Sequence, residues 1–197
     1  FLETHLGLVN QRDDLYLEYI TLLNIEKRHL KALQLIKERQ FHPWEGGEGK
    51  VPAQYIFANI ELAKQAIQNE EFNKALQFLF DAQEYPLNLG EGKLFGAQEN
   101  DVFYWLGCVY HELGNKLKSR EYWEMASKGS EDLSPALFYN DQSPDKIFYQ
   151  GLAHLKLGNK STALSRFNKL IDYGESHLFD EIKIDYFAVS LPDLLIW

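Results

Sequence analysis

The feature that most constrains this chain is a pattern of small and large side chains that recurs about every 44 residues. A small residue near the middle of one expected helix is followed twelve positions later by a second small residue, four further on by a large apolar one, and three beyond that by another apolar one. The matching positions are Ala63, Gly107 and Gly151; Ala75, Ser119 and Ala163; Leu79, Trp123 and Phe167; and Ala82, Ala126 and Leu170. A fainter copy lies upstream at Ile20, Ala32 and Ile36. Self-similarity at such a period is typical of helical-repeat architectures.

The spacing predicts pairs of helices that pack through small side chains. Two helices approach closely where both present small residues, so we expect Gly or Ala to face Ala across each hairpin, with large residues filling the adjoining grooves. Gly114 and Gly158 follow two of the expected first helices and can supply a left-handed turn. We expect first helices over 13–26, 53–69, 99–113 and 145–157, second helices over 28–40, 71–84, 116–128 and 160–172, and a fifth helix over 179–191.

Residues at the repeat positions resemble the consensus of the tetratricopeptide family. They are Leu106, Gly107, Tyr110, Gly114, Trp123 and Ala126, and again Gly151, Gly158, Ala163 and Phe167. Ser119, His154 and Leu170 depart from that consensus, and the period exceeds the family's 34 residues by about ten. The resemblance implies an all-α, right-handed superhelical solenoid. It would form one domain over 1–197, with repeats at 13–43, 53–86, 99–130 and 144–174 and a terminal half-repeat at 179–191.

Two inter-repeat loops, 43–50 and 86–93, share the pattern Pro-x3-Gly-Glu-Gly-Lys. The string 42–50 resembles the tetratricopeptide portion of large bacterial proteins of unknown function, in which helical repeats accompany a β-sandwich region resembling sugar mutarotases. A phosphate-binding loop needs Gly-x4-Gly-Lys followed by Ser or Thr, but Val51 and Leu94 follow the two lysines. We interpret the loops as structural turns and leave open a weak anion, peptide or sugar contact. The candidate contact residues are Trp44, Glu48, Lys50, Glu91 and Lys93.

Composition and spacing argue against several functions. A net charge of −9 with no basic stripe is unlike a nucleic-acid binder, and no stretch approaches the ~18 apolar residues of a membrane span. The single cysteine, Cys108, rules out a disulfide framework and fits a cytoplasmic location. His111 and His154 do not form a recognised metal motif, and no pair of carboxylates is selected by spacing. We therefore expect neither catalysis, nor a cofactor, nor a metal.

The resemblance implies that partners bind along the first helices, on the concave wall of the solenoid. The positions that match the family's groove are Phe57, Ile60, Lys64, Tyr104, Cys108, His111, Asp145, Phe148 and Leu152. This aromatic and mildly acidic set favours an apolar or basic segment. We expect an interaction scaffold for a protein segment or an adjacent domain of the same chain. The alternative is an accessory region of a larger sugar-processing enzyme.

The sequence begins without Met and ends on apolar residues, so we expect a piece of a longer protein that can form a homodimer through its terminal repeat.

Overall fold

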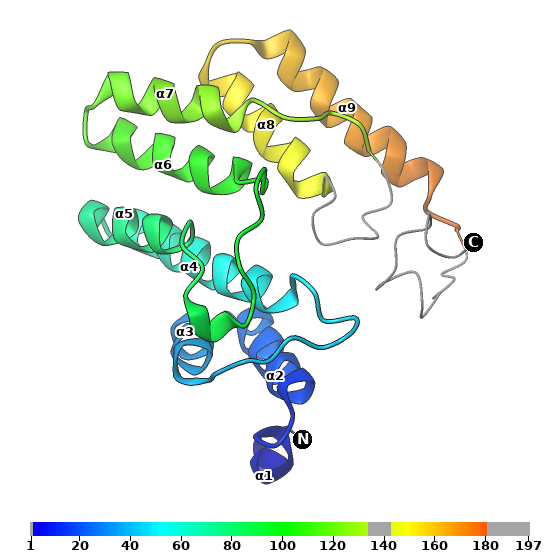
Figure 1. Ribbon diagram of the computed structural model, residues 1–197. Helices are drawn as coiled ribbons and strands as arrows, with labels where there is room; N and C mark the ends of the chain where they lie inside the picture. Colours follow the sequence, from blue (N-terminus) through cyan, green and yellow to red (C-terminus); the bar gives the residue numbers. More distant parts are fainter. Residues whose placement is uncertain (1, 134–142, 181–197) are drawn as a thin grey trace. The chain divides into compact units, whose positions relative to one another are not determined.

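The computed structural model describes residues 2–133 and 143–180, and within these residues all regular structure is helical, with no strand (Figure 1). The elements are η1 (Leu2–His5), α1 (Leu6–Val9), α2 (Asp13–Ile25), α3 (His29–Glu38), α4 (Lys50–Gln68), α5 (Phe72–Asp81), η2 (Leu87–Leu89), α6 (Asn100–Glu112), α7 (Lys116–Ala126), α8 (Pro144–Lys156) and α9 (Lys160–Ser176). The all-α prediction is confirmed. The helix expected at 179–191 lies outside the described residues, apart from its first two positions, which are not helical.

The turns that join the helices of each hairpin share one backbone conformation. The residue with positive φ is Lys27 (62°), Glu70 (59°), Gly114 (73°) or Gly158 (84°), so it recurs every 43 or 44 positions. The next backbone N–H donates to a carbonyl five residues earlier, for example from Asn115 to Tyr110 at 2.8 Å, which is the closing bond of a Schellman motif. The glycine turns expected at 114 and 158 are confirmed, while the first two hairpins place a charged residue in the same left-handed region.

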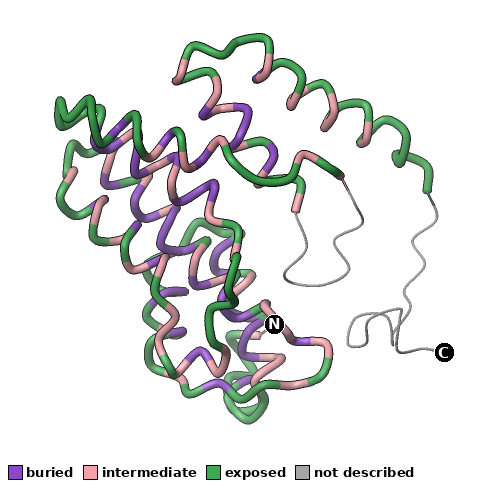
Figure 2. Tube along the Cα trace, turned by 45° about the horizontal axis from the view of Figure 1, so that its top comes forward, coloured by how far each residue is buried: buried purple, intermediate pink, exposed green. Residues whose placement is uncertain are grey.

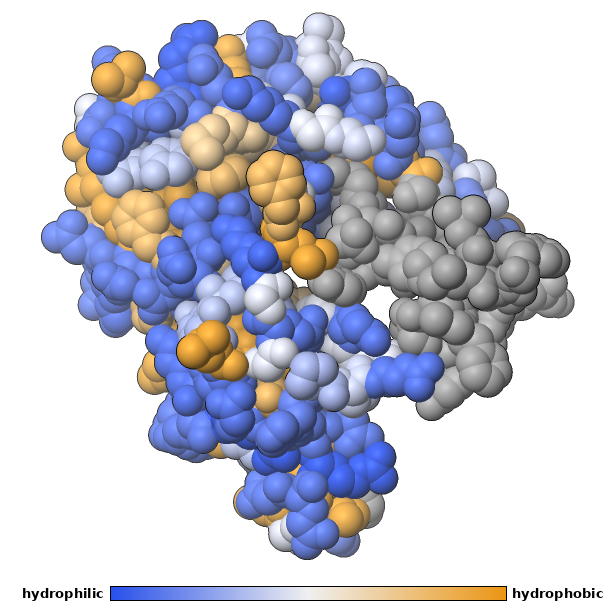
Figure 3. All heavy atoms as spheres, viewed as in Figure 1, coloured by the Kyte–Doolittle hydropathy of each residue, from blue (hydrophilic) through white to orange (hydrophobic). Residues whose placement is uncertain are grey.

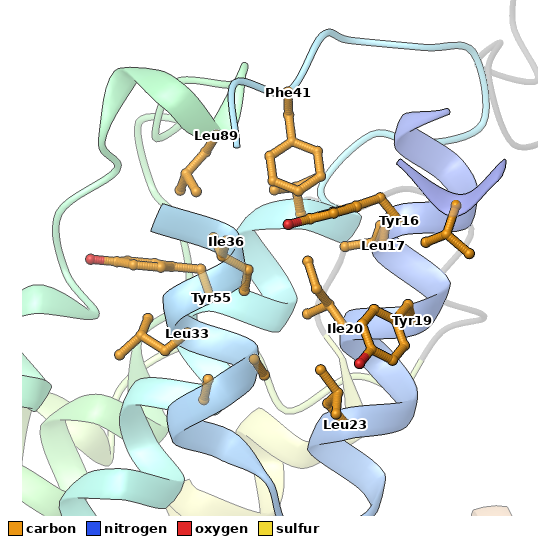
Figure 4. Packing of buried hydrophobic residues seen from close by; sticks show 14 of the residues in the cluster. Tyr16, Leu17, Tyr19, Ile20, Leu23, Leu33, Ile36, Phe41, Tyr55 and Leu89 are labelled. Carbon is orange, nitrogen blue, oxygen red and sulfur yellow. The ribbon is translucent and has the colours of Figure 1, made fainter. Parts of the chain in front are cut away.

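The described helices fall into two compact units, Phe1–Leu94 and Phe95–Trp197. In the first unit α2 pairs with α3, α4 pairs with α5, and α4 also contacts both α2 and α3. Figure 4 shows the resulting core, in which side chains from α2, α3 and α4 meet Phe41 from the loop after α3 and Leu89 from η2. Burial of this core is the main stabilising term available to the unit.

The second unit repeats this arrangement of two hairpins. The pairs are α6 with α7 and α8 with α9, and α8 contacts both helices of the first pair. Tyr104, Trp123, Ala126 and Ala153 form the centre of its core. Figure 2 shows α9 exposed along most of its length, and Ala163 is the one buried residue of that helix.

The glycines of the repeat make a closer contact than the sequence predicts. A Cβ added to Gly107 would lie 2.5 Å from Nε1 of Trp123, and one added to Gly151 would lie 2.8 Å from Cζ of Phe167. The expectation that the glycine also faces the small residue of the second helix stays a prediction. The large aromatic residue four positions later lies over the glycine, because a ring fits against backbone only where no side chain intervenes.

Candidate interaction surface

Polar and aromatic contacts join α8 to both α6 and α7 in the second unit. At one end, Lys146 Nζ lies 2.6 Å from Asp101 Oδ2, and both side chains are largely buried. One turn further on, the rings of Tyr104 and Tyr149 lie 5.6 Å apart. At the far end, Lys156 Nζ lies 5.5 Å from the centre of the Trp123 ring, within the range of a cation–π contact.

The residues of α8 that make these contacts, together with buried Ala153, share one helix face. They are Lys146, Tyr149, Ala153 and Lys156, spaced at i, i+3, i+7 and i+10. This face carries a lysine at each end, with an aromatic side chain and then a small one between them. It fits a surface of α6 and α7 that offers an acid and two large aromatic rings.

The same surface recurs on the second hairpin of the unit, but there it is open. We call it the end face; it consists of Asp145, Phe148 and Leu152 of α8 and Phe167 of α9, each 44 residues after its counterpart on α6 or α7. Phe148 is 44% exposed, whereas its counterpart Tyr104 is 9% exposed. Its ring contacts those of Tyr149 and Phe167, at 5.6 and 5.8 Å. Apolar surface is thus left without a described neighbour.

The face of the molecule drawn in Figure 3 is mostly hydrophilic where its residues are described. Figure 3 shows apolar side chains reaching this surface in separate groups among polar ones. Exposed apolar side chains also occur outside the end face: on α9, Leu164 and Ile171 are each at least 40% exposed. The end face therefore stands out by its acid and its two adjacent aromatic rings, and not by exposed apolar surface alone.

The structure separates the predicted groove residues of α4. Phe57 is 45% exposed and meets the buried ring of His29 edge-on at 5.8 Å. Ile60 is 5% exposed, and Lys64 pairs with Glu61 at 2.6 Å. The assignment of these three residues to a contact wall stays a prediction.

The groove residues predicted on α6 are also divided. Tyr104 is buried beneath Tyr149, so in this structure it packs against α8. Cys108 is half-buried, and burial raises the pKa of its thiol, which opposes a nucleophilic role. His111 is exposed and its ring lies 5.5 Å from that of Trp123.

The two glycine-rich loops of the first unit contact each other. Glu91 Oε2 accepts a hydrogen bond from the backbone N–H of Gly49, the residue before α4, at 2.8 Å. The indole of Trp44 covers Gly47, and Lys93 donates to the carbonyl of Gln83 at 3.0 Å. Burial raises the pKa of Glu91. A carboxylate here already uses the start of α4, so a phosphate would meet a negative group instead of free N–H donors.

The remaining two loop candidates make fewer contacts. Lys50 is exposed at the start of α4, and Glu48 has a buried Oε2 atom without a hydrogen-bond partner. Asn88, which ties the second loop to the end of α3, was missed by the sequence reasoning. Its side-chain amide donates to the carbonyls of Ile36 and Arg39 at the end of α3. No sequence signal marks it, since the matching position of the other loop is Glu45.

Among the described residues, no group of three or more His, Cys, Asp or Glu side chains is placed to hold a metal ion. His154 has a buried Nδ1 atom without a hydrogen-bond partner. No helix in the described ranges combines the length and apolar character that crossing a membrane requires.

Two histidines, His29 and His154, lead us to expect that the chain loses stability in mild acid. Burial lowers the pKa of His29 and of His154 below the ordinary 6.5. As the pH falls, the two histidines are therefore protonated in the unfolded chain before they are protonated in the folded one. The stability that the neutral histidines contribute is fully present above about pH 6.5. It is lost as the pH falls from 6.5 towards the lower pKa of the folded state. Glu61, Lys64 and Lys27 also act on His29.

We expect urea midpoints measured from pH 7.5 to pH 5 to fall less steeply in His29→Gln than in the unchanged chain. His5→Gln, at an exposed site, is the matched control. Equal slopes in all three proteins would contradict the assignment.

No family model matches this chain, and no solved structure matches it significantly.

Proposed function

We propose that this chain is an interaction scaffold whose end face binds an amphipathic helix from a partner protein or an adjacent domain. In this proposal its hairpins stack as about four tetratricopeptide-like repeats into a right-handed superhelix. The observation that carries the proposal is internal to the second unit. The counterpart of the end face on α6 and α7 is occupied by a helix, α8, through an ion pair and aromatic contacts.

The contacts of α8 define the chemistry of the partner. Asp145 takes the place of Asp101 and favours a Lys or Arg, while Phe148 takes the place of Tyr104 and favours an aromatic ring. Leu152 takes the place of Cys108 and favours a small residue opposite, because the third position of the α8 face is the buried Ala153. The net charge of −9 also steers basic helices towards the chain, so binding should weaken as salt rises.

A labelled peptide with the sequence of Pro144–Lys156 is a direct probe, because it carries the face that already binds α6 and α7. We expect fluorescence anisotropy to show that Phe148→Ala in the full chain weakens peptide binding about ten-fold, through loss of a central aromatic contact.

Two controls accompany this titration. Leu117→Ala, at a residue of α7 that is 80% exposed, should leave the affinity unchanged. A peptide with Ala in place of Tyr149 should bind weakly to every protein. Equal affinity of the unchanged chain and Phe148→Ala for the probe would sink the proposal.

A further inference from the structure

We propose that the end face binds a helix in one direction only, parallel to α8 and with the N-terminus of the bound helix at Asp145. The partner helix then carries a basic, an aromatic, a small and a second basic residue at i, i+3, i+7 and i+10, in that order. The inference rests on the function proposed above and narrows its partner, but the two can fail separately.

The helix that covers the counterpart of the end face, α8, runs parallel to α6. The cation in the first turn of α8, Lys146, pairs with the acid in the first turn of α6, Asp101. One turn further along both helices, the rings of Tyr149 and Tyr104 meet. The contacts follow the same order in both helices, which requires that the two helices point the same way.

The groups of the end face follow this order too. Trp123 lies over Gly107, in the second half of α6, and its ring is 5.5 Å from the cation of Lys156, the last residue of α8. Phe167 lies over Gly151 in the same way. A bound helix with the direction of α8 would therefore bring its second basic residue to the Phe167 ring, where a cation–π contact is available.

The spacing of the α8 face does not by itself fix a direction. Its contact residues are separated by three, four and three positions, which is the same from either end, and a lysine stands at both ends. Only the order of the two central residues, Tyr149 before Ala153, distinguishes the directions. A partner turned end for end would place its small residue opposite Phe148 and its ring opposite Leu152.

Two physical effects favour the parallel direction. The N-terminus of a helix carries a partial positive charge, and Asp145, whose side chain is 56% exposed, places a carboxylate there. In the opposite direction, the same carboxylate would face the partially negative C-terminus. Side chains also lean towards the N-terminus of their own helix, so a helix turned end for end cannot place its side chains at the same four points.

An exchanged peptide tests the direction. It has the sequence of Pro144–Lys156 with Tyr149→Ala and Ala153→Tyr, so its composition, charge and ends are unchanged. Turned end for end, it presents the original order, so it would bind as tightly as the original peptide if direction were immaterial. We expect fluorescence anisotropy with the full chain to show at least five-fold weaker binding of the exchanged peptide. Circular dichroism of the two free peptides controls for a difference in helix content.

Reactive groups on the original peptide report the direction itself. In a full-length Cys108→Ala background, a single cysteine is placed by Ser143→Cys, just before α8, or by Leu155→Cys, near the end of α8 at a position that is 43% exposed. We expect an N-terminal chloroacetyl group on the peptide to react at least five-fold faster with the first variant, and a C-terminal one with the second. Rates with free chloroacetamide correct for the intrinsic reactivity of each thiol.

The outcomes separate the direction from the binding. Equal affinities of the two peptides, or labelling without a preference between the two cysteines, would overturn the inference and leave the proposed function standing. If neither peptide bound to the chain, the proposed function would fail and the inference with it.

Discussion

Lys146→Met is expected to lower the free energy of unfolding by about 3–5 kcal/mol, because it leaves a buried carboxylate without its cation. Asp101 is 6% exposed, and its Oδ2 atom lies 2.6 Å from Lys146 Nζ. Its other oxygen accepts the backbone N–H of Val102 at 3.0 Å, so it cannot turn towards water without breaking that bond. Urea unfolding followed by circular dichroism measures the change.

Replacing the acid of this pair, in Asp101→Asn, should lower the free energy of unfolding by less than Lys146→Met does. The comparison separates the cost of a buried, unpaired carboxylate from the loss of the ion pair itself. In Asp101→Asn, Lys146 keeps Asp145 at 3.6 Å, so the cation retains a partner. The double variant Asp101→Asn with Lys146→Met should recover much of the loss, since no charge remains buried.

Arg120→Met is the surface control for this series. Its pair with Glu124 is exposed on both sides (69% and 49%), so the loss should stay below about 0.5 kcal/mol. If Arg120→Met and Lys146→Met lowered the free energy of unfolding equally, burial of the Asp101–Lys146 pair would not explain the loss.

The hairpins could be predicted from the sequence because their signal is local and repeated. Expected helices at 13–26, 99–113 and 145–157 correspond to α2, α6 and α8 with boundaries shifted by at most one residue. Small residues, helix stops and large apolar residues all act within one hairpin, so four copies reinforce one another. The superhelical stacking of the hairpins stays a prediction, as do the single domain and the partner.

The loops could not be predicted, because identical motifs took different conformations. Gly90 has a φ of 77°, whereas the matching residue of the first loop, Gly47, does not have a positive φ. The difference follows from tertiary contacts. A Cβ at Gly90 would lie 2.7 Å from the carbonyl oxygen of Phe41, so close approach of the other loop sets the requirement for glycine. Nothing within either motif encodes that contact.

The role of the candidate site stays a prediction, but burial already divides its residues. Phe148 and Asp145 are exposed as a contact surface requires, whereas Tyr104, at the position that matches Phe148, is buried beneath Tyr149 of α8. A helix position has one environment where a later helix covers it and another where none does. Sequence register assigns the position to a face and cannot show which copies are covered.

Gly107→Ala is expected to destabilise the chain by about 2–3 kcal/mol, although alanine normally favours a helix by up to about 1 kcal/mol. The added methyl would meet the Trp123 ring at 2.5 Å, and this ring is 6% exposed and cannot swing aside without opening the core. Gly151→Ala should cost less, because Phe167 is only half-buried and can move.

Gly174→Ala is the control for helix propensity, in the last turn of α9 with no atom within 4 Å of the added methyl, and should stabilise the chain by up to about 0.5 kcal/mol. Urea midpoints and near-ultraviolet circular dichroism of the three variants test the order. The opposite signs expected at Gly107 and Gly174 isolate the ring contact from helix propensity. If Gly107→Ala were as stable as Gly174→Ala, the glycine at the centre of the repeat would not be required by packing, and the 44-residue pattern would need another cause.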